Sequence, residues 1–138
     1  MEPMQPPQVF VLAPFDQEGR RVQDIVRRAI QKAGLGVVQY SDAIRPGAEL
    51  TSTILDAIRA ADLIIADISR QDSNVFYEIG FAHALRKRTM LLISIKSGSR
   101  LPSDFDGLQY FVYDPENLEH LAATVTAETR ALTMPRCA

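Results

Sequence analysis

The stretch DSNVFYEIGFAHA (72–84) places one carboxylate, Glu78, inside a run that is otherwise largely apolar. If this stretch is helical, Glu78 shares a face with Asn74, a candidate substrate-binding residue near the start of the helix. A capping box requires its acidic residue three positions after the N-cap. That position is Tyr77 if Asn74 is the N-cap, and Phe76 if Ser73 is the N-cap. We therefore predict that Glu78 faces a cleft. The alternative is that Glu78 only caps the helix, stabilised by the helix dipole, or lies on the surface.

A carboxylate in this setting suits cleavage of a C–N glycosidic bond. The reaction passes through an oxocarbenium-like state, which a nearby anion stabilises or traps covalently. The helix N-terminus is expected to keep Glu78 ionised at neutral pH. Asp72, six residues earlier, is the candidate general acid for a neutral leaving base, and its alternative role is that of a turn or N-cap residue.

Short apolar runs rich in branched residues predict buried strands at 8–15, 62–68 and 89–95, with weaker strands at 35–40 and 108–114. Helical patterns lie between them, with apolar stripes at Val22, Ile25, Val26, Ala29 and Ile30, and at Ile54, Leu55, Ile58 and Ala61. Gly34 is expected to stop the first helix, and Lys87 and Arg88 the third.

This alternation predicts an α/β, flavodoxin-like three-layer sandwich: a five-stranded parallel sheet in the order 2-1-3-4-5 with helices on both faces. Ligands of such sheets bind outside the carboxyl ends of strands 1 and 3, where the strand order reverses. Those ends are APFD (13–16) and ADISRQDSN (66–74), so the Glu78 motif falls at the predicted cleft.

Size and charge exclude several function classes. The 138 residues, 46% hydrophobic and 23% charged, predict a single domain over 8–132 with flexible ends at 1–7 and 133–138. A net charge of -2 and a pI near 5.6 give no basic field for nucleic acid, and no apolar run is long enough to span a membrane. A single unpaired cysteine, Cys137, and an N-terminus without signal-peptide features suggest a cytoplasmic protein.

Other residues near the predicted cleft have two possible roles each. Phe15 and Tyr77 are candidates for stacking on a base, or are simply cleft wall. Asp16, Asp42 and Ser69 follow strands, where they either bind ribose hydroxyls or cap helices. Arg45 and Arg70 are candidates for a phosphate, or are solvated charges.

The sequence predicts neither a metal nor a bound cofactor. Its two histidines, His83 and His120, and its one cysteine are dispersed, which argues against a structural zinc site. It has no G-x-G-x-x-G after the first strand and no Walker A motif. If NAD binds, we therefore expect it as a substrate.

Two family resemblances converge on the same motif. DSNVFYEIG resembles the nucleoside 2-deoxyribosyltransferase signature, with Asp72, Glu78 and Gly80 matching in spacing and Asn74-Val75 replacing a Gly-Thr pair, and VFVLAPF (9–15) resembles that family's first strand and loop. Residues 42–69, 67–87 and 101–114 are similar to prokaryotic Toll/interleukin-1 receptor (TIR)-like proteins of antiphage signalling systems. Together the similarities span about residues 9–114.

Both resemblances imply that Glu78 is catalytic and that a ribosyl N-glycosidic bond is cleaved or exchanged. The Arg45-Pro46-Gly47 loop resembles that of the TIR-like proteins and favours NAD or another nucleotide as the substrate, whereas the Ala13-Pro14-Phe15 segment resembles that of the transferases. Nicotinamide leaves NAD as a neutral molecule, so a single carboxylate suffices for it.

Two non-enzymatic possibilities remain open on the sequence. TIR resemblance also implies homo-oligomers or assembly with a partner, and some such domains are signalling modules without turnover. A phosphoacceptor receiver domain shares the strand order and places an aspartate, here Asp67, at the end of strand 3. It lacks the expected lysine at the end of strand 5, where this chain has FVYDPEN.

Overall fold

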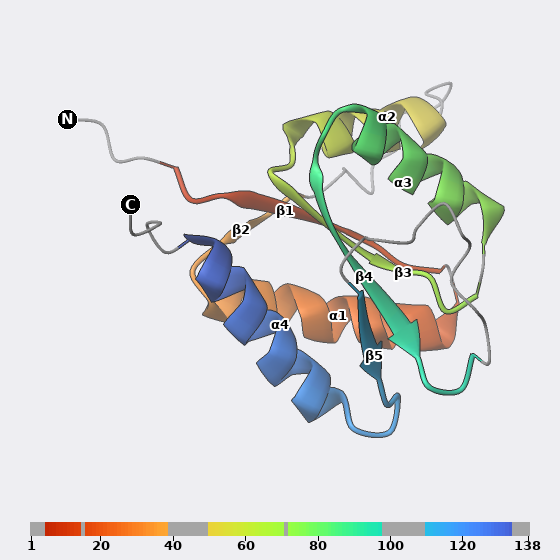
Figure 1. Ribbon diagram of the computed structural model, residues 1–138, viewed down its shortest axis with the longest axis vertical. Coiled ribbons are helices and arrows are strands. Elements are labelled where there is room, and N and C mark those ends of the chain that lie inside the picture. Colours follow the sequence, from red (N-terminus) through yellow and green to blue (C-terminus); the bar gives the residue numbers. More distant parts are fainter. Residues whose placement is uncertain (1–4, 15, 39–49, 71, 98–109, 134–138) are drawn as a thin grey trace.

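The computed structural model describes residues 5–14, 16–38, 50–70, 72–97 and 110–133, and it confirms the predicted flavodoxin-like architecture (Figure 1). Five parallel strands form one sheet in the order β2-β1-β3-β4-β5. The strands are β1 (Gln8–Leu12), β2 (Gly36–Val37), β3 (Leu63–Asp67), β4 (Arg88–Ser94) and β5 (Tyr110–Tyr113). The helices are α1 (Gln17–Lys32), α2 (Leu50–Ala60), α3 (Ser73–Ala84) and α4 (Leu118–Thr133).

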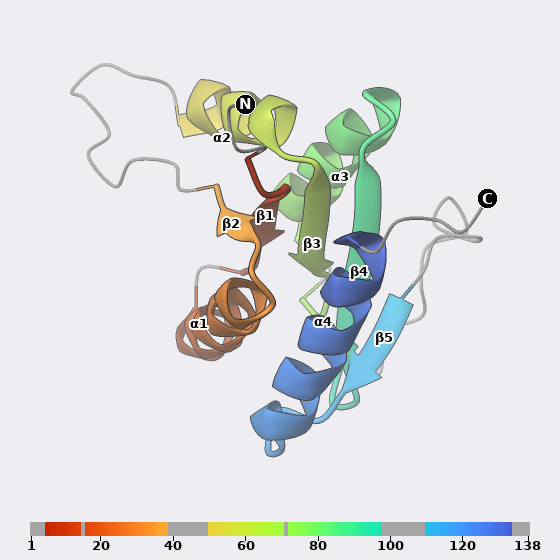
Figure 2. The ribbon, with the colours of Figure 1, turned by 90° about the vertical axis from the view of Figure 1, so that its left-hand side faces the viewer.

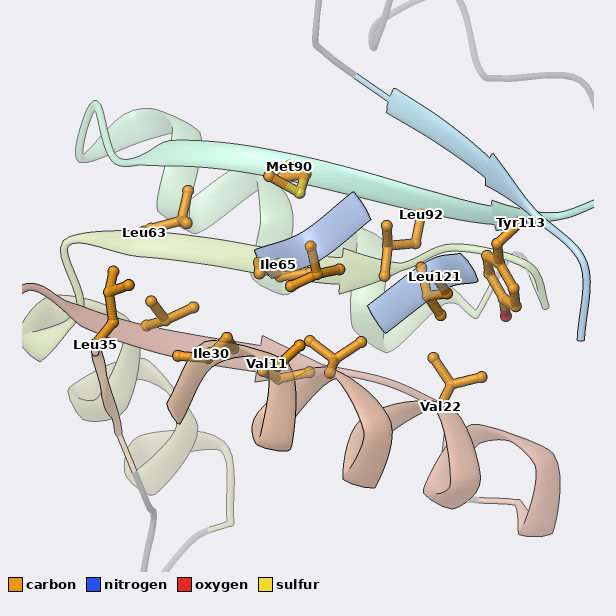
Figure 3. Packing of buried hydrophobic residues seen from close by; sticks show 14 residues of the cluster. Val11, Val22, Ile30, Leu35, Leu63, Ile65, Met90, Leu92, Tyr113 and Leu121 are labelled. Atoms are coloured by element: carbon orange, nitrogen blue, oxygen red, sulfur yellow. The ribbon is translucent and has the colours of Figure 1, made fainter. Parts of the chain in front are cut away.

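The helices cover the two faces of the sheet in pairs, α1 with α4 and α2 with α3 (Figure 2). Alternating residues of β1 and β3 supply both cores: Val11 and Ile65 pack toward α1 and α4, and Phe10 and Ile64 pack toward α2 and α3. Figure 3 shows the first of these cores, in which side chains of the sheet meet those of α1 and α4. Burial on both faces explains why these strands read as continuous apolar runs.

The first two strands are shorter than predicted. β1 ends at Leu12 rather than continuing to residue 15, and Pro14, which has no N–H for a sheet hydrogen bond, is buried in the loop that follows. β2 comprises only Gly36 and Val37 of the predicted 35–40. Among the described residues, the pairing with β2 involves only Gln8 and Val9, and β1 continues beyond it to Leu12.

The loop after β1 is packed tightly against the first turn of α1. Asp16 is the N-cap, and its carboxylate accepts a hydrogen bond of 2.6 Å from the Gly19 N–H. A Cβ atom on Gly19 would lie 2.1 Å from the Pro14 carbonyl oxygen, so only glycine fits at this position. This contact holds α1 close to the carboxyl end of β1.

Helices α1 and α3 end in the same motif. After α1, Gly34 has φ 87°, and the N–H groups of Gly34 and Leu35 return to carbonyls of the last turn, as in a Schellman cap. After α3, Arg86 adopts the equivalent left-handed conformation, with φ 58°. The predicted stop at Gly34 is confirmed, whereas α3 ends earlier than predicted, because Arg86 turns the chain and Arg88 already begins β4.

Among the described residues, no helix is both long and apolar enough to cross a membrane.

Candidate functional site

Glu78 lines a pocket where the start of α3 meets the carboxyl end of β1. We call this the Glu78 pocket, and its lining comprises Phe10, Val11, Leu12, Ala13, Gln23, Ile54, Asp72, Asn74, Val75 and Glu78. The apolar part of the lining comes from β1, α2 and Val75, and the polar part comes from Asp72, Asn74 and Glu78 at the start of α3 and from Gln23 of α1. The structure thus brings together three of the predicted site residues, Glu78, Asp72 and Asn74.

Asp72 is the N-cap of α3. Its backbone is extended, and its carboxylate accepts a 2.8 Å hydrogen bond from the Asn74 N–H. Asp72 therefore caps α3, and it also lines the Glu78 pocket. Glu78 lies six residues after this N-cap, whereas a capping box requires a separation of three.

The protonation of Glu78 differs from the sequence-based prediction. Burial, and then the negative charge of Asp72, together raise the pKa of Glu78 from 4.5 to about 7. The expectation that the helix N-terminus keeps Glu78 ionised at neutral pH is therefore wrong. Near pH 7 the Glu78 carboxyl is present in both the protonated and the ionised form.

The Glu78 pocket is small. Its volume of about 40 Å³ accommodates one to a few water molecules. Pockets that enclose a whole small-molecule ligand measure roughly 300–1,000 Å³. The described residues therefore enclose a space smaller than a whole small-molecule ligand.

Ser69 and Arg70 lie in a different hollow, on the α1 and α4 side of the sheet. This Ser69 hollow is lined by Pro14, Glu18, Gly19, Asp67, Ser69, Arg70, Ser94, Lys96, Ser97 and Tyr113. Arg70 donates to Asp16 at 2.8 Å and to Glu18 at 2.7 Å, and these contacts raise the pKa of the guanidinium. The Gly19 N–H, and then Arg70, hold the pKa of Asp16 below its ordinary value. Neither Asp16 nor Ser69 lines the Glu78 pocket.

The remaining predicted residues fall into two groups. Tyr77 is 61% exposed and is not part of the pocket lining, and His83 is exposed on α3. Phe15, Asp42 and Arg45 lie outside the described residues, as does the rest of the loop 39–49.

Gln23 and Ile54 are pocket residues that the sequence did not single out. Gln23 is a polar residue of α1 next to the buried Val22, and nothing distinguishes it from the solvated side of that helix. Ile54 belongs to the apolar stripe of α2, so its pattern indicated core packing only. Recognising either as a pocket residue requires knowledge of how the two helices approach β1.

No group of three or more histidine, cysteine, aspartate or glutamate side chains within the described part of the chain has the geometry to hold a metal ion. Asp67, the candidate phosphoacceptor, is 3% exposed, and both of its carboxylate oxygens accept hydrogen bonds from Ser69 or Tyr113.

Several solved structures share this fold. A CMP N-glycosidase from Clostridium botulinum is 26% identical, with a TM-score of 0.62 over 85% of this chain and 98% of that chain. A 2-deoxyribosyltransferase from Bacillus psychrosaccharolyticus is 21% identical, with a TM-score of 0.61 over 86% and 95%. The TIR domain of a Toll-related receptor from Hydra magnipapillata is 14% identical, with a TM-score of 0.64 over 88% and 97%. No protein-family model matches the chain, and no curated protein matches its sequence.

These similarities confirm the fold that both resemblances imply. The chain has the fold shared by nucleoside deoxyribosyltransferase-like enzymes and TIR domains, and two of the three structures are of enzymes that act on N-glycosidic bonds.

Proposed function

We propose that this protein is an enzyme that cleaves the N-glycosidic bond of a nucleotide, with Glu78 at the anomeric carbon. One observation carries the proposal: Glu78 and Asp72 line the same pocket at the carboxyl end of β1, where Glu78 has a pKa of about 7. Perturbed carboxyl groups in a cleft are typical of catalytic sites.

The pair of carboxyl groups supplies the acid and the anion that this reaction needs. In the reactive state the pair holds one proton. As the C–N bond breaks, its electron pair leaves with the base, and the proton of the pair passes to a base nitrogen or oxygen. Glu78 is then an anion beside the positively charged sugar, which it stabilises or traps. Water adds to the sugar, and the proton that it releases returns the pair to its starting state.

A nucleoside monophosphate with a neutral base is the first candidate substrate. Such a base must be protonated as it leaves, and a carboxyl group that is still protonated near pH 7 provides that proton. The similarity to the CMP N-glycosidase supports the same substrate class.

NAD is the second candidate. Its nicotinamide is a cationic pyridinium, so it leaves without protonation and requires only the ionised form of Glu78. The similarity of the strand-2 loop to that of TIR-like proteins favours NAD, although that loop lies outside the described residues.

The direct test is incubation of the purified chain with nucleoside monophosphates, deoxynucleosides, NAD and NADP, followed by chromatography of the products. We expect free base from at least one substrate, and a loss of at least about a hundredfold in kcat for Glu78→Gln. Glu119→Gln, an exposed substitution on α4, is the matched control and should retain activity.

The products also distinguish the alternatives. Base exchange in the presence of a second free base would indicate a deoxyribosyltransferase. Absence of turnover at high protein concentration, where assemblies form, together with a biological effect that survives Glu78→Gln, would indicate a non-catalytic assembly module and refute the proposal.

A further inference from the structure

Asp67, the last residue of β3, lies outside the Glu78 pocket in a network of short hydrogen bonds. Among the described residues it is the only charged side chain that is fully buried. Its carboxylate accepts three hydrogen bonds, from the Tyr113 hydroxyl at 2.7 Å, the Ser69 N–H at 3.0 Å and the Ser69 hydroxyl at 2.5 Å. These bonds compensate the cost of burying a polar group at this position.

This network joins three strands at their carboxyl ends. Asp67 belongs to β3 and Tyr113 to β5, and the Ser94 N–H of β4 donates to the Ser69 hydroxyl at 2.8 Å. The next residue, Arg70, is held by the two acids at the start of α1. The chain that leaves β3 is therefore attached to β4, β5 and α1 within its first three residues.

The same connection leads to Asp72, the second carboxyl group of the Glu78 pocket. Only two residues separate Arg70 from Ser73, where α3 begins, and Asp72 is the N-cap at that point. Because the connection is so short, few backbone dihedral angles separate Ser69 from Asp72. A displacement of Ser69 therefore also displaces Asp72. Small displacements of reacting groups have large effects on rate.

We propose that Asp67, Ser69 and Tyr113 are positioning residues, which fix the β3–α3 connection and thereby set Asp72 relative to Glu78. None of the three lines the Glu78 pocket, so they act on it through the connection. The inference rests on the proposed function for its effect on catalysis, and its geometric part is testable without it.

The test compares Tyr113→Phe with Thr129→Val. Tyr113→Phe removes one hydroxyl and retains the ring that packs in the α1 and α4 core. Thr129→Val removes a buried hydroxyl from α4 that bonds to Val125 and Thr126, so it controls for the loss of a buried hydrogen bond elsewhere. Ser69→Ala is the second network variant and provides the same test if Tyr113→Phe folds poorly.

Two quantities are measured in each variant: kcat and KM for the best substrate, and the pKa of Glu78 by carbon-13 NMR titration of its carboxyl. For Tyr113→Phe and Ser69→Ala we expect kcat to fall by about tenfold or more, KM to change by less than about threefold, and the Glu78 pKa to move by at least about half a pH unit. Thr129→Val should change neither quantity.

The two readouts separate the inference from the proposed function. If the wild-type protein shows no activity and the network variants shift the Glu78 pKa, the result supports positioning and refutes the proposed function. Normal activity and an unchanged Glu78 pKa in both network variants would overturn the inference and leave the function standing.

Discussion

Replacing Glu78 with glutamine should stabilise the protein at alkaline pH and have little effect on stability at acidic pH. The reason is the raised pKa of Glu78, because this half-buried carboxyl resists ionisation in the folded state and ionises freely in the unfolded state. Its contribution to stability is complete below pH 4.5, where both states are protonated. It decreases as the pH rises and is lost above about pH 7, where the folded state must also ionise.

The magnitude follows from the two pKa values. The rise from 4.5 to about 7 corresponds to roughly 3 kcal/mol at about 1.4 kcal/mol per pH unit. Glu78 is only partly buried, and solvent screening reduces this figure to about 2 kcal/mol. Glutamine has the shape of the protonated acid and does not ionise, so Glu78→Gln should be about 2 kcal/mol more stable than the wild type at pH 8 and nearly equal to it at pH 4.5.

Urea unfolding followed by circular dichroism at pH 4.5, 6 and 8 measures this difference. Glu119→Gln is the control for general loss of a negative charge, since Glu119 is exposed. Asp72→Asn retains an N-cap oxygen but removes the second cause of the raised pKa, so it should reduce the effect of Glu78→Gln. An effect of Glu78→Gln that is the same at all three pH values would refute the reasoning.

Three further substitutions test the local structure that holds the site, each by chemical unfolding. Gly19→Ala should destabilise the protein by about 2 kcal/mol, because the added Cβ would lie 2.1 Å from the Pro14 carbonyl oxygen; an unchanged midpoint would contradict this packing. Arg86→Gly should stabilise it by about 0.5–1 kcal/mol by relieving a φ of 58°, and a loss of stability would show that the Arg86 side chain contributes more than its backbone strain costs. Gly80→Ala should gain about 0.5–1 kcal/mol, since Gly80 lies within α3 and a Cβ there meets nothing within 4 Å; a loss of stability would refute the open environment.

The sequence predicted the sheet order and the place of the Glu78 motif because both depend on local patterns. Continuous apolar runs identified β1, β3 and β4 as strands buried on both faces, and alternation with helices left one economical strand order. The same order placed 66–74 at the reversal between β1 and β3, which is where Glu78, Asp72 and Asn74 meet in the structure.

The protonation of Glu78 was beyond prediction from local sequence. The helix N-terminus is a local feature and argued for an ionised acid. Burial is the larger cause of the raised pKa, and the Glu78 pocket is lined by residues distant in sequence, such as Phe10 and Leu12 of β1 and Ile54 of α2. Their proximity to Glu78 is a property of the packed helix pair and sheet.

The two faces of the sheet explain why strand-end residues divide between two hollows. Leu63, Ile65 and Asp67 alternate toward α1 and α4, whereas Ile64, Ala66 and Ile68 point toward α2 and α3. Sequence reasoning grouped Ser69 with Glu78 because both follow β3. In the structure Ser69 bonds to Asp67 on one side of the sheet, whereas Asp72 lines the Glu78 pocket on the other.

The pH dependence of the rate distinguishes the two candidate substrates, because they require opposite forms of Glu78. A neutral base must be protonated by the carboxyl pair, so kcat/KM for a nucleoside monophosphate should fall as the pH rises through about 7. NAD requires the ionised form, so its kcat/KM should rise over the same interval. A pyridinium bound near Glu78 also stabilises the carboxylate, so the NAD profile of kcat should lie at lower pH than that of kcat/KM. Each profile is measured by chromatography of released base between pH 5 and 9. A kcat/KM that is flat across this interval for an active substrate would mean that the Glu78 proton takes no part in the reaction.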